Sequence, residues 1–518
     1  MRTLALSILL AIVSSRGVAQ TLGTIDFPNS GKPAAQTSFL RGVLLLHSFE
    51  YDDAAKAFRE AQAADPDFAL AYWGEAMTYT HPLWNEQNLP AAQAALERLG
   101  TTAAQRLERA GSERERQYMQ TTEALYFAEA SKPKRDTLCA DAFENITRNF
   151  PSDDEAKAFY ALWLMGLSQG VRNVPTYMRA GALAEEIYRR NPKHPGALHY
   201  IIHAFDDPVH APLGLFAARE YAGIATDADH AQHMTTHIFL ALGMWDETIS
   251  QNVVAAGHDS ANWKPGHYTS WMDYGLLQEG KYDAARRHLE LMRGNLAAAP
   301  SAGRQGALLA MRAHYLVISH RFDDEVTHWV LEAPLAGPVP KAMDAFALGY
   351  AAVSRGDRRV AESHLLEVKA LAKRLQADTT YVGNRRVPGV LATELEALLL
   401  TSGGKRDQGI ALLQQISRES DSFPSEFGPP DIVKPTHELL GELLFDAGRP
   451  ALAEQEFTKA LESAPGRSAA LLGLARAAKK SGDLTTSQRA LAQLERNWSG
   501  ADPSLPELAQ LQDLRAAR

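Results

Sequence analysis

One spacing of small and large apolar residues occurs twice in this sequence, about four hundred residues apart. The two copies consist of Gly42, Leu45, Ala54, Phe58, Ala61 and Pro66, and of Gly441, Leu444, Ala453, Phe457, Ala460 and Pro465. Successive members are separated by 3, 9, 4, 3 and 5 residues in both copies. A small residue lets a second helix approach closely, a large residue fills the space beside it, and proline ends the second helix. The spacing therefore predicts stacked pairs of antiparallel helices.

This pattern resembles the tetratricopeptide repeat, whose signature positions these residues occupy. Weaker copies with related spacing are Asp273, Leu276, Ala285, Leu289 and Met292, and Gly349, Ala352, Ala361, Leu365 and Val368. Turn glycines fall where the helix pairs should bend, at Gly243, Gly280, Gly356, Gly448 and Gly482. The resemblance implies an all-α solenoid of helical hairpins, wound as a right-handed superhelix whose first helices line a concave face.

Stretches rich in proline and glycine at 294–306, 332–341 and 422–435 predict joints within the solenoid. We expect an N-terminal solenoid with the histidine-rich repeats over 35–293, middle helical repeats over 304–420 and C-terminal repeats over 434–498. No alternating apolar run bounded by hairpin turns predicts a strand.

Residues 1–19 have the layout of a cleavable export signal. Arg2 precedes an apolar run from Leu4 to Val13, and the small residues Gly17 and Ala19 stand before a cut ahead of Gln20. That run is too short to span a membrane, and no later segment reaches about 18 uninterrupted apolar residues. We expect a periplasmic or secreted protein without an integral membrane segment after cleavage; an uncleaved N-terminal anchor is the alternative.

The charge and the cysteine content argue against a nucleic-acid-binding protein and against a fold held by disulfides. The chain has 53 basic and 62 acidic residues, a formal charge of −9, so no nucleic-acid partner is expected. The single cysteine, Cys139, excludes an intrachain disulfide, and its amphipathic surroundings predict a buried side chain. There is no P-loop, dinucleotide fingerprint, nucleophile elbow or HExxH motif.

Nine of the 17 histidines lie between His194 and His267. Among them are two HxxxH pairs, His199 with His203 and His233 with His237. This spacing places both members of a pair on one helix face, one turn apart. His199, His233 and His267 follow one another at intervals of 34 residues, as do His203 and His237. Since 34 is the length of the repeat, the pairs should stack on adjacent first helices.

The stacked pairs predict a metal site on the concave face, with the ligands His199, His203, His233, His237 and His267. Asp206 and Asp207 follow His203 by about one turn, and either supply a carboxylate ligand or hold an imidazole through its second nitrogen. These donors favour zinc or copper, with iron and manganese as alternatives. The other interpretation is that the histidines bind peptide or fill partly buried polar positions.

A second group of groove candidates lies nearer the N-terminus and comprises His47, Glu75, His81, Trp84 and Glu86. His47 and His81 are also 34 residues apart, and the sequence after His81 departs from the repeat pattern with a loop. Trp84 and Glu86 are therefore expected to point into the groove. The alternative is inter-repeat packing with a polar rim.

The whole chain resembles exported bacterial tetratricopeptide proteins with a central HxxxH…HxxHxxxH region, a resemblance that implies a fold but no reaction. Because repeats of this type mostly serve as docking surfaces, the first hypothesis is an exported scaffold that binds a protein or peptide and carries a histidine-based metal site. The second is a metalloenzyme, hydrolytic or oxidative, with an open coordination position for water or dioxygen. The third is that the histidines only fill polar positions in the core and bind no ligand.

Overall fold

The structure is a computed structural model that describes residues 21–168, 172–257, 266–296, 299–378, 381, 383–424 and 427–516. The predicted export signal, residues 1–19, lies outside the described residues. The described chain forms 25 α-helices, two short 3-10 helices and one two-stranded hairpin, which confirms the predicted all-α solenoid of helical hairpins. None of the helices described is long and apolar enough to cross a membrane.

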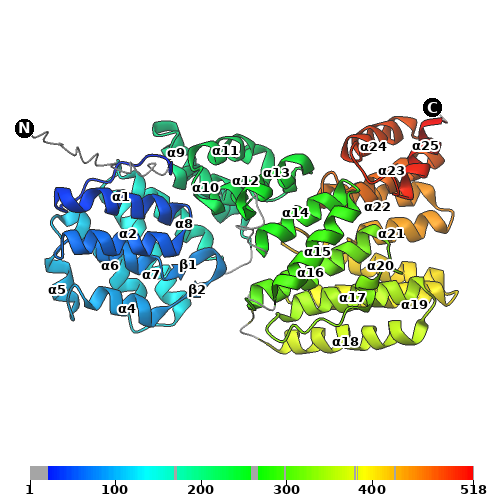
Figure 1. Cartoon of the computed structure of the whole chain (residues 1–518), viewed down its shortest axis with the longest axis horizontal. Helices are drawn as coiled ribbons and strands as arrows, with labels where there is room; N and C mark the ends of the chain where they lie inside the picture. The colour runs from blue at the N-terminus through cyan, green and yellow to red at the C-terminus, as the bar shows by residue number, and fades with distance from the viewer. Residues whose placement is uncertain are drawn as a thin grey trace, which may run out of the picture.

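Helices of the first half run from the left of Figure 1 across its upper centre, each packed against a neighbour in sequence. They are α1 (Pro33–His47), α2 (Tyr51–Ala64), α3 (Ala69–Met77), α4 (Leu89–Glu97), α5 (Ala103–Glu108), α6 (Glu113–Tyr126), α7 (Lys132–Asn149), α8 (Asp154–Gly166), α9 (Val174–Arg190), α10 (Pro195–Phe205), α11 (Ala211–Ile224), α12 (Asp229–Ala241) and α13 (Trp245–Ala256).

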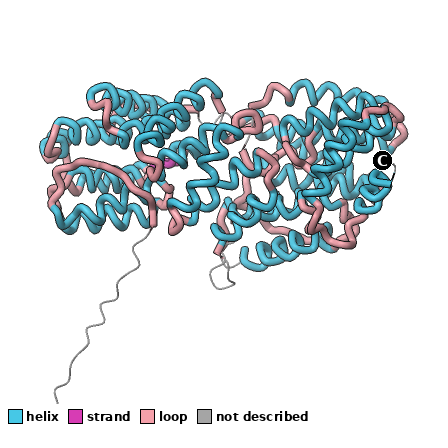
Figure 2. Tube along the Cα trace, turned by 90° about the horizontal axis from the view of Figure 1, so that it is seen from above, coloured by secondary structure: helices cyan, strands magenta, loops and turns pink. Residues whose placement is uncertain are grey.

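The second half lies to the right and continues the same stacking of helix on helix (Figures 1 and 2). Its helices are α14 (His267–Gln278), α15 (Tyr282–Leu296), α16 (Ala302–Ser319), η2 (Glu325–His328), α17 (Pro338–Ser354), α18 (Arg358–Ala377), α19 (Val387–Ser402), α20 (Arg406–Ser420), α21 (Thr436–Asp446), α22 (Pro450–Ser463), α23 (Ser468–Ser481), α24 (Leu484–Asn497) and α25 (Glu507–Ala516).

The repeated spacing has a direct role in packing. The ring of Phe58 on α2 lies between Gly42 on α1 and Gly74 on α3, where an added Cβ would come within 2.8 and 2.3 Å of a ring carbon. The same arrangement recurs on α21, α22 and α23 with Gly441, Phe457 and Gly473. Glycine is required because any side chain would push the helices away from the ring.

All five predicted turn glycines adopt left-handed backbone between the two helices of a pair. Their φ angles are +68° at Gly243, +69° at Gly280, +77° at Gly356, +71° at Gly448 and +95° at Gly482. Glycine enters this region without the steric cost that a Cβ imposes. The predicted bends are therefore confirmed at these positions.

One segment departs from the helical pattern between α3 and α4. It forms β1 (Thr80–His81), the 3-10 helix η1 (Pro82–Trp84) and β2 (Glu86–Gln87), with Thr80 paired to Gln87 in antiparallel register. The sequence predicted a loop here and no strand. Two-residue strands are too short to show an alternating apolar pattern.

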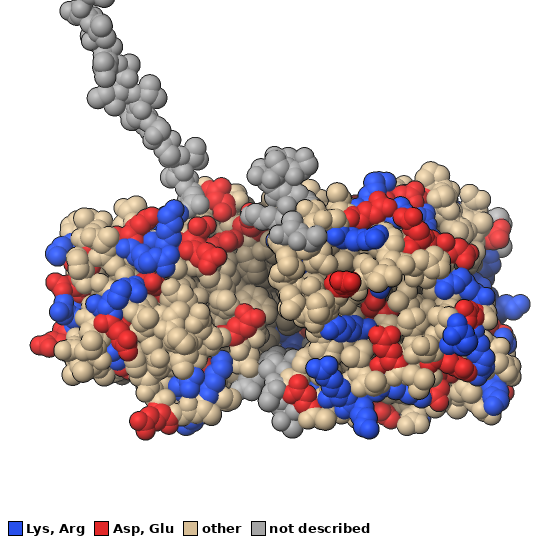
Figure 3. Space-filling model, turned by 60° about the horizontal axis from the view of Figure 1, so that its bottom comes forward, with Lys and Arg blue, Asp and Glu red and all other residues tan. Residues whose placement is uncertain are grey.

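Buried apolar residues form two large clusters, one spanning Leu22 to Ala241 and the other spanning Trp245 to Leu514. Cys139 belongs to the first cluster and is fully buried, as expected. The two clusters meet where α12, α13 and α14 pack in succession, inside the first of the predicted segments, 35–293. Between the two halves the surface is hollowed (Figure 3).

Candidate metal centre

Six histidines from three helices form two groups of three. The first triad is His199, His203 and His230, and the second triad is His233, His237 and His267. Helix α10 supplies two of these side chains, α12 supplies three, and α14 begins at the sixth. Within each triad the ligand nitrogens lie within 4.8 Å of one another. An ion at the centre of such a triangle would lie at most about 2.8 Å from each nitrogen, so an inward shift below about 1 Å reaches a normal metal–imidazole bond.

The predicted stacking of repeats brings together histidines from α10, α12 and α14, which are the first helices of successive repeats. The ring centroids of His203 and His237, 34 residues apart, are separated by 5.7 Å. Those of His233 and His267, also 34 apart, are separated by 4.6 Å. The five predicted histidine ligands therefore lie in one region of the structure, with His267 as the exposed member.

Oxygen atoms hold three of the rings through their Nδ1 atoms. The pairs are His199 with the carbonyl of His47 at 2.6 Å, His233 with Oδ1 of Asn252 at 2.7 Å, and His237 with Oδ2 of Asp206 at 2.5 Å. Since a carbonyl or carboxylate oxygen can only accept, Nδ1 carries the proton in each ring. The lone pair then resides on Nε2, so Nε2 is the nitrogen of each ring that can bind a metal.

Four buried imidazole nitrogens of the two triads have no hydrogen-bond partner among the described residues. They are the Nε2 atoms of His199, His203, His230 and His233. A buried polar atom without a partner costs about 1–3 kcal/mol. Four such atoms pointing into one region indicate a ligand that accepts their lone pairs, and a cation has that property.

Burial favours the uncharged form of the same four rings. Burial lowers the pKa of His199, His203, His230 and His233 well below the usual 6.5, and neighbouring imidazoles lower it further. Protonation would place a charge in an apolar setting and would remove the lone pair. The site is therefore electrostatically prepared to bind a metal without first releasing protons.

The two aspartates after α10 have different partners. Asp206 holds the ring of His237, the second of the two roles considered for it. Asp207 instead forms an ion pair with Arg172 at 2.6 Å and contacts Nδ1 of His210 at 2.8 Å. Its charge is thus compensated by groups outside the two triads.

In a third group of potential ligands, His47 with Glu155 and His194, hydrogen bonds occupy all the ring nitrogens. Glu155 lies 2.7 Å from Nε2 of His47 and 3.0 Å from Nε2 of His194. The remaining nitrogens contact the hydroxyl of Tyr200 at 2.9 Å and the backbone N–H of Ala197 at 3.1 Å. Burial opposes ionisation of Glu155, but the two histidines lower its pKa to about 2. Every ring nitrogen is satisfied, so this group stabilises the fold and leaves no lone pair for a metal.

Glu75 is also buried instead of lining a groove. Its carboxylate accepts from Gln62 at 2.6 Å and forms ion pairs with Arg98 and, at 3.3 Å, with Arg59. His47 and Glu75 thus take part in packing between repeats, the alternative considered for this group.

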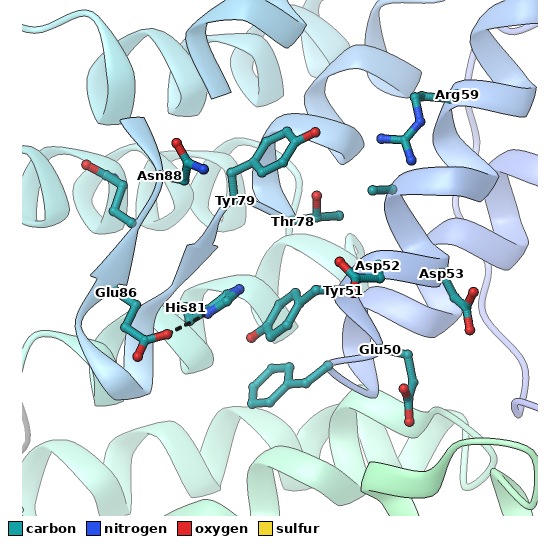
Figure 4. Close-up of a pocket in the computed structure, with 13 residues that line it drawn as sticks. Glu50, Tyr51, Asp52, Asp53, Arg59, Thr78, Tyr79, His81, Glu86 and Asn88 are labelled. Carbon is teal, nitrogen blue, oxygen red and sulfur yellow. Dashed lines mark hydrogen bonds and ion pairs between the residues drawn. The ribbon is translucent and has the colours of Figure 1, made fainter. Parts of the chain in front are cut away.

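Two of the other groove candidates, His81 and Glu86, line an open pocket of about 1070 Å³ (Figure 4). They face each other across the β1–β2 hairpin, with Nδ1 of His81 3.1 Å from the carboxylate. The ring of Tyr51 stacks on His81 at 4.0 Å. Trp84 is 42% exposed beside them.

Phe49 joins this pocket to the first triad. It lines the pocket, and its ring centroid lies 4.2 Å from His199, 5.5 Å from His230 and 5.9 Å from His203. Its φ angle of +56° is rare for a bulky residue and indicates local strain. One aromatic ring therefore forms both the wall of the pocket and the cover of three imidazoles.

Three residues of the site were not predicted from the sequence. His230 lies three residues before His233, a helical spacing that could have identified it, and its ring faces His199 at 5.2 Å. Asn252 and Phe49 carry no such signal, because only the packing of α13 and of the α1–α2 turn brings them to the histidines.

A model of the tetratricopeptide repeat family matches residues 444–497. The chain contains a tetratricopeptide repeat. The matched segment includes most of the second copy of the repeated spacing, where Phe457 packs between two glycines. No curated protein gave a significant match to the chain.

Three of the solved structures that match this chain are the following. Human IFIT1 with m7Gppp-AAAA has 13% identity and a TM-score of 0.37, covering 92% of this chain and 91% of that chain. Yeast Tom70 has 12% identity and a TM-score of 0.29, covering 93% and 95%. Pseudomonas aeruginosa pilF has 19% identity and a TM-score of 0.25, covering 48% and 96%. Similarity at this level says nothing about the function of this chain.

Proposed function

We propose that this chain is an exported tetratricopeptide scaffold protein that binds metal through the two triads. The proposal rests on the four buried Nε2 atoms that have no hydrogen-bond partner among the described residues. Oxygen partners on the second nitrogen of three rings support it, because metal-ligating histidines are held in this way. Ligand sets made of imidazoles favour zinc or copper over manganese, and iron remains an alternative.

Elemental analysis tests this proposal on mature protein purified without a histidine tag. We expect at least one zinc or copper ion per chain, and we expect the double variant His203→Ala/His237→Ala to lose metal while the helical content is retained. A matched control, His364→Ala on α18, removes a histidine outside the triads and should leave the metal content unchanged. Full metal content in the double variant would overturn the assignment of ligands.

The scaffold role draws support from the tetratricopeptide repeat and from the open pocket beside Phe49. Repeats of this kind expose grooves that accept peptide segments. Pull-down from the periplasm with and without chelator tests this role, since a scaffold retains its partner after metal removal. Export rests on residues 1–19, and N-terminal mass analysis of the secreted chain should give Gln20 as its first residue.

A metalloenzyme is the second candidate, favoured by the contact of Phe49 with both the pocket and the first triad. A three-histidine site leaves a coordination position free for water or dioxygen. Turnover that disappears with the metal and returns when the metal is restored would support this candidate. Peptide binding without any metal-dependent turnover would favour the scaffold alone.

A further inference from the structure

The two triads lie close enough together to form one site for two metal ions. Across their boundary the ring centroids of His203 and His237 lie 5.7 Å apart, and those of His230 and His233 lie 6.0 Å apart. Within the first triad, the corresponding distance between His199 and His203 is 4.8 Å. The gap between triads is thus only slightly wider than the gaps inside them, and ions bound in both would be neighbours.

No carboxylate oxygen belongs to either triad within the described residues. Asp206 is hydrogen-bonded to the outer nitrogen of His237, and Asp207 is paired with Arg172. Two divalent ions would therefore introduce four positive charges into a buried region, where the carboxylate of Asp206 offsets only one of them, and this is costly. Two monovalent ions would introduce only two.

Copper is the metal that combines a monovalent state with affinity for imidazole. We propose that the two triads bind a pair of copper ions, and that dioxygen binds between them. This inference rests on the proposed metal-binding function and adds the number of ions, their identity and the small molecule that they bind.

Charge and electrons balance in this step. Each Cu(I) ion gives up one electron, and the two electrons reduce one dioxygen to a peroxide dianion whose O–O bond order falls from two to one. No proton is consumed. The two ions carry a total charge of +2 before the reaction, and two Cu(II) ions with the bound dianion also carry +2. A buried site without ligand carboxylates can hold both states because its total charge stays constant.

The test uses the full mature chain, stripped of metal and loaded with Cu(I) without oxygen. We expect two copper ions per chain by elemental analysis and the uptake of one dioxygen per chain on exposure to air. The oxidised ions should be magnetically coupled, so that the electron paramagnetic resonance signal accounts for far less copper than is present. One copper per chain, or a signal that accounts for all of it, would overturn the pair but not metal binding. A chain that binds neither copper nor zinc would overturn the proposed function as well.

Single-triad variants provide the second measurement. His230→Leu removes a ligand of the first triad, and His267→Leu removes the exposed ligand of the second. Each should hold one copper, which gives a full resonance signal once ferricyanide has oxidised it to Cu(II), whereas the control His364→Leu should keep two ions and the weak signal after exposure to air. Circular dichroism on the same samples verifies folding. If either triad variant keeps two coupled ions, the assignment of three ligands to each ion is wrong.

Discussion

Asp206 accepts a hydrogen bond from His237 across 2.5 Å, and both side chains are buried. The contact fixes the tautomer that directs Nε2 of His237 toward the other rings. Because such partners typically change metal affinity by about 10–100-fold, Asp206→Ala should weaken metal binding by that factor, and Asp206→Asn should weaken it less. Competition with a chelator of known affinity measures both variants. Equal affinities for wild type and Asp206→Ala would show that this contact does not position the ring.

Phe49 covers the first triad on the side of the pocket. Phe49→Ala removes that cover but leaves every ligand atom in place, so we expect metal loss to a chelator to become faster by about tenfold or more. The measurement is the rate of metal transfer, followed by absorbance of the chelator complex. Leu484→Ala on α24 is the control, because it removes an exposed apolar side chain that lies outside the site. An unchanged rate for Phe49→Ala would mean that metal leaves by another route.

The fold could be predicted because its signal is local and repeated. Gly42 and Phe58 share their spacing with Gly441 and Phe457, and each glycine is required by a ring that contacts it. A small residue between two helices gives the same sequence spacing wherever it occurs in the chain. The hairpin at Thr80–Gln87 gives no recognisable sequence pattern, because it consists of two short strands and a turn.

The candidate site was predicted in part for the same reason. His203 and His237 are related by the repeat length, so the stack of helices brings them together. His47 shows where this argument fails. It has the same 34-residue relation to His81, yet its ring is buried against Glu155 while His81 lines the pocket. Repeat length places two helices side by side, but packing around each ring decides which way it points.

The glycines that flank Phe457 offer a test of the packing. In Gly473→Ala the new Cβ would lie 2.3 Å from the ring, so the helices must separate, and we expect destabilisation of about 1–3 kcal/mol. Gly74→Ala should have a similar effect on the first half, through Phe58. The control is Gly303→Ala, which meets no atom within 4 Å. Thermal unfolding followed by circular dichroism compares the three. A Gly473→Ala variant as stable as the control would contradict the packing argument.

Glu394 on α19 should make the stability of the second half depend on pH. Burial raises its pKa from 4.5 to about 8, although the hydroxyl of Thr436 contacts one carboxyl oxygen at 2.7 Å. The folded protein therefore holds a proton that the unfolded chain releases above pH 4.5, and stability is lost as pH rises from 4.5 through 8 by about 1.4 kcal/mol per unit.

Glu394→Gln cannot ionise and should be free of this loss. We expect its urea midpoint to exceed that of the wild type clearly at pH 8 and much less at pH 5. A gain of equal size at both pH values would point to a packing effect and not to the ionisation of Glu394.

Metal content tests the central claim most directly. Tag-free mature protein, the double variant His203→Ala/His237→Ala and the control His364→Ala are purified side by side and their zinc, copper, iron and manganese are counted per chain. The account predicts copper or zinc in the wild type and the control, none in the double variant, and two ions per chain when copper is supplied. Wild-type protein that is free of metal and takes up none would contradict it.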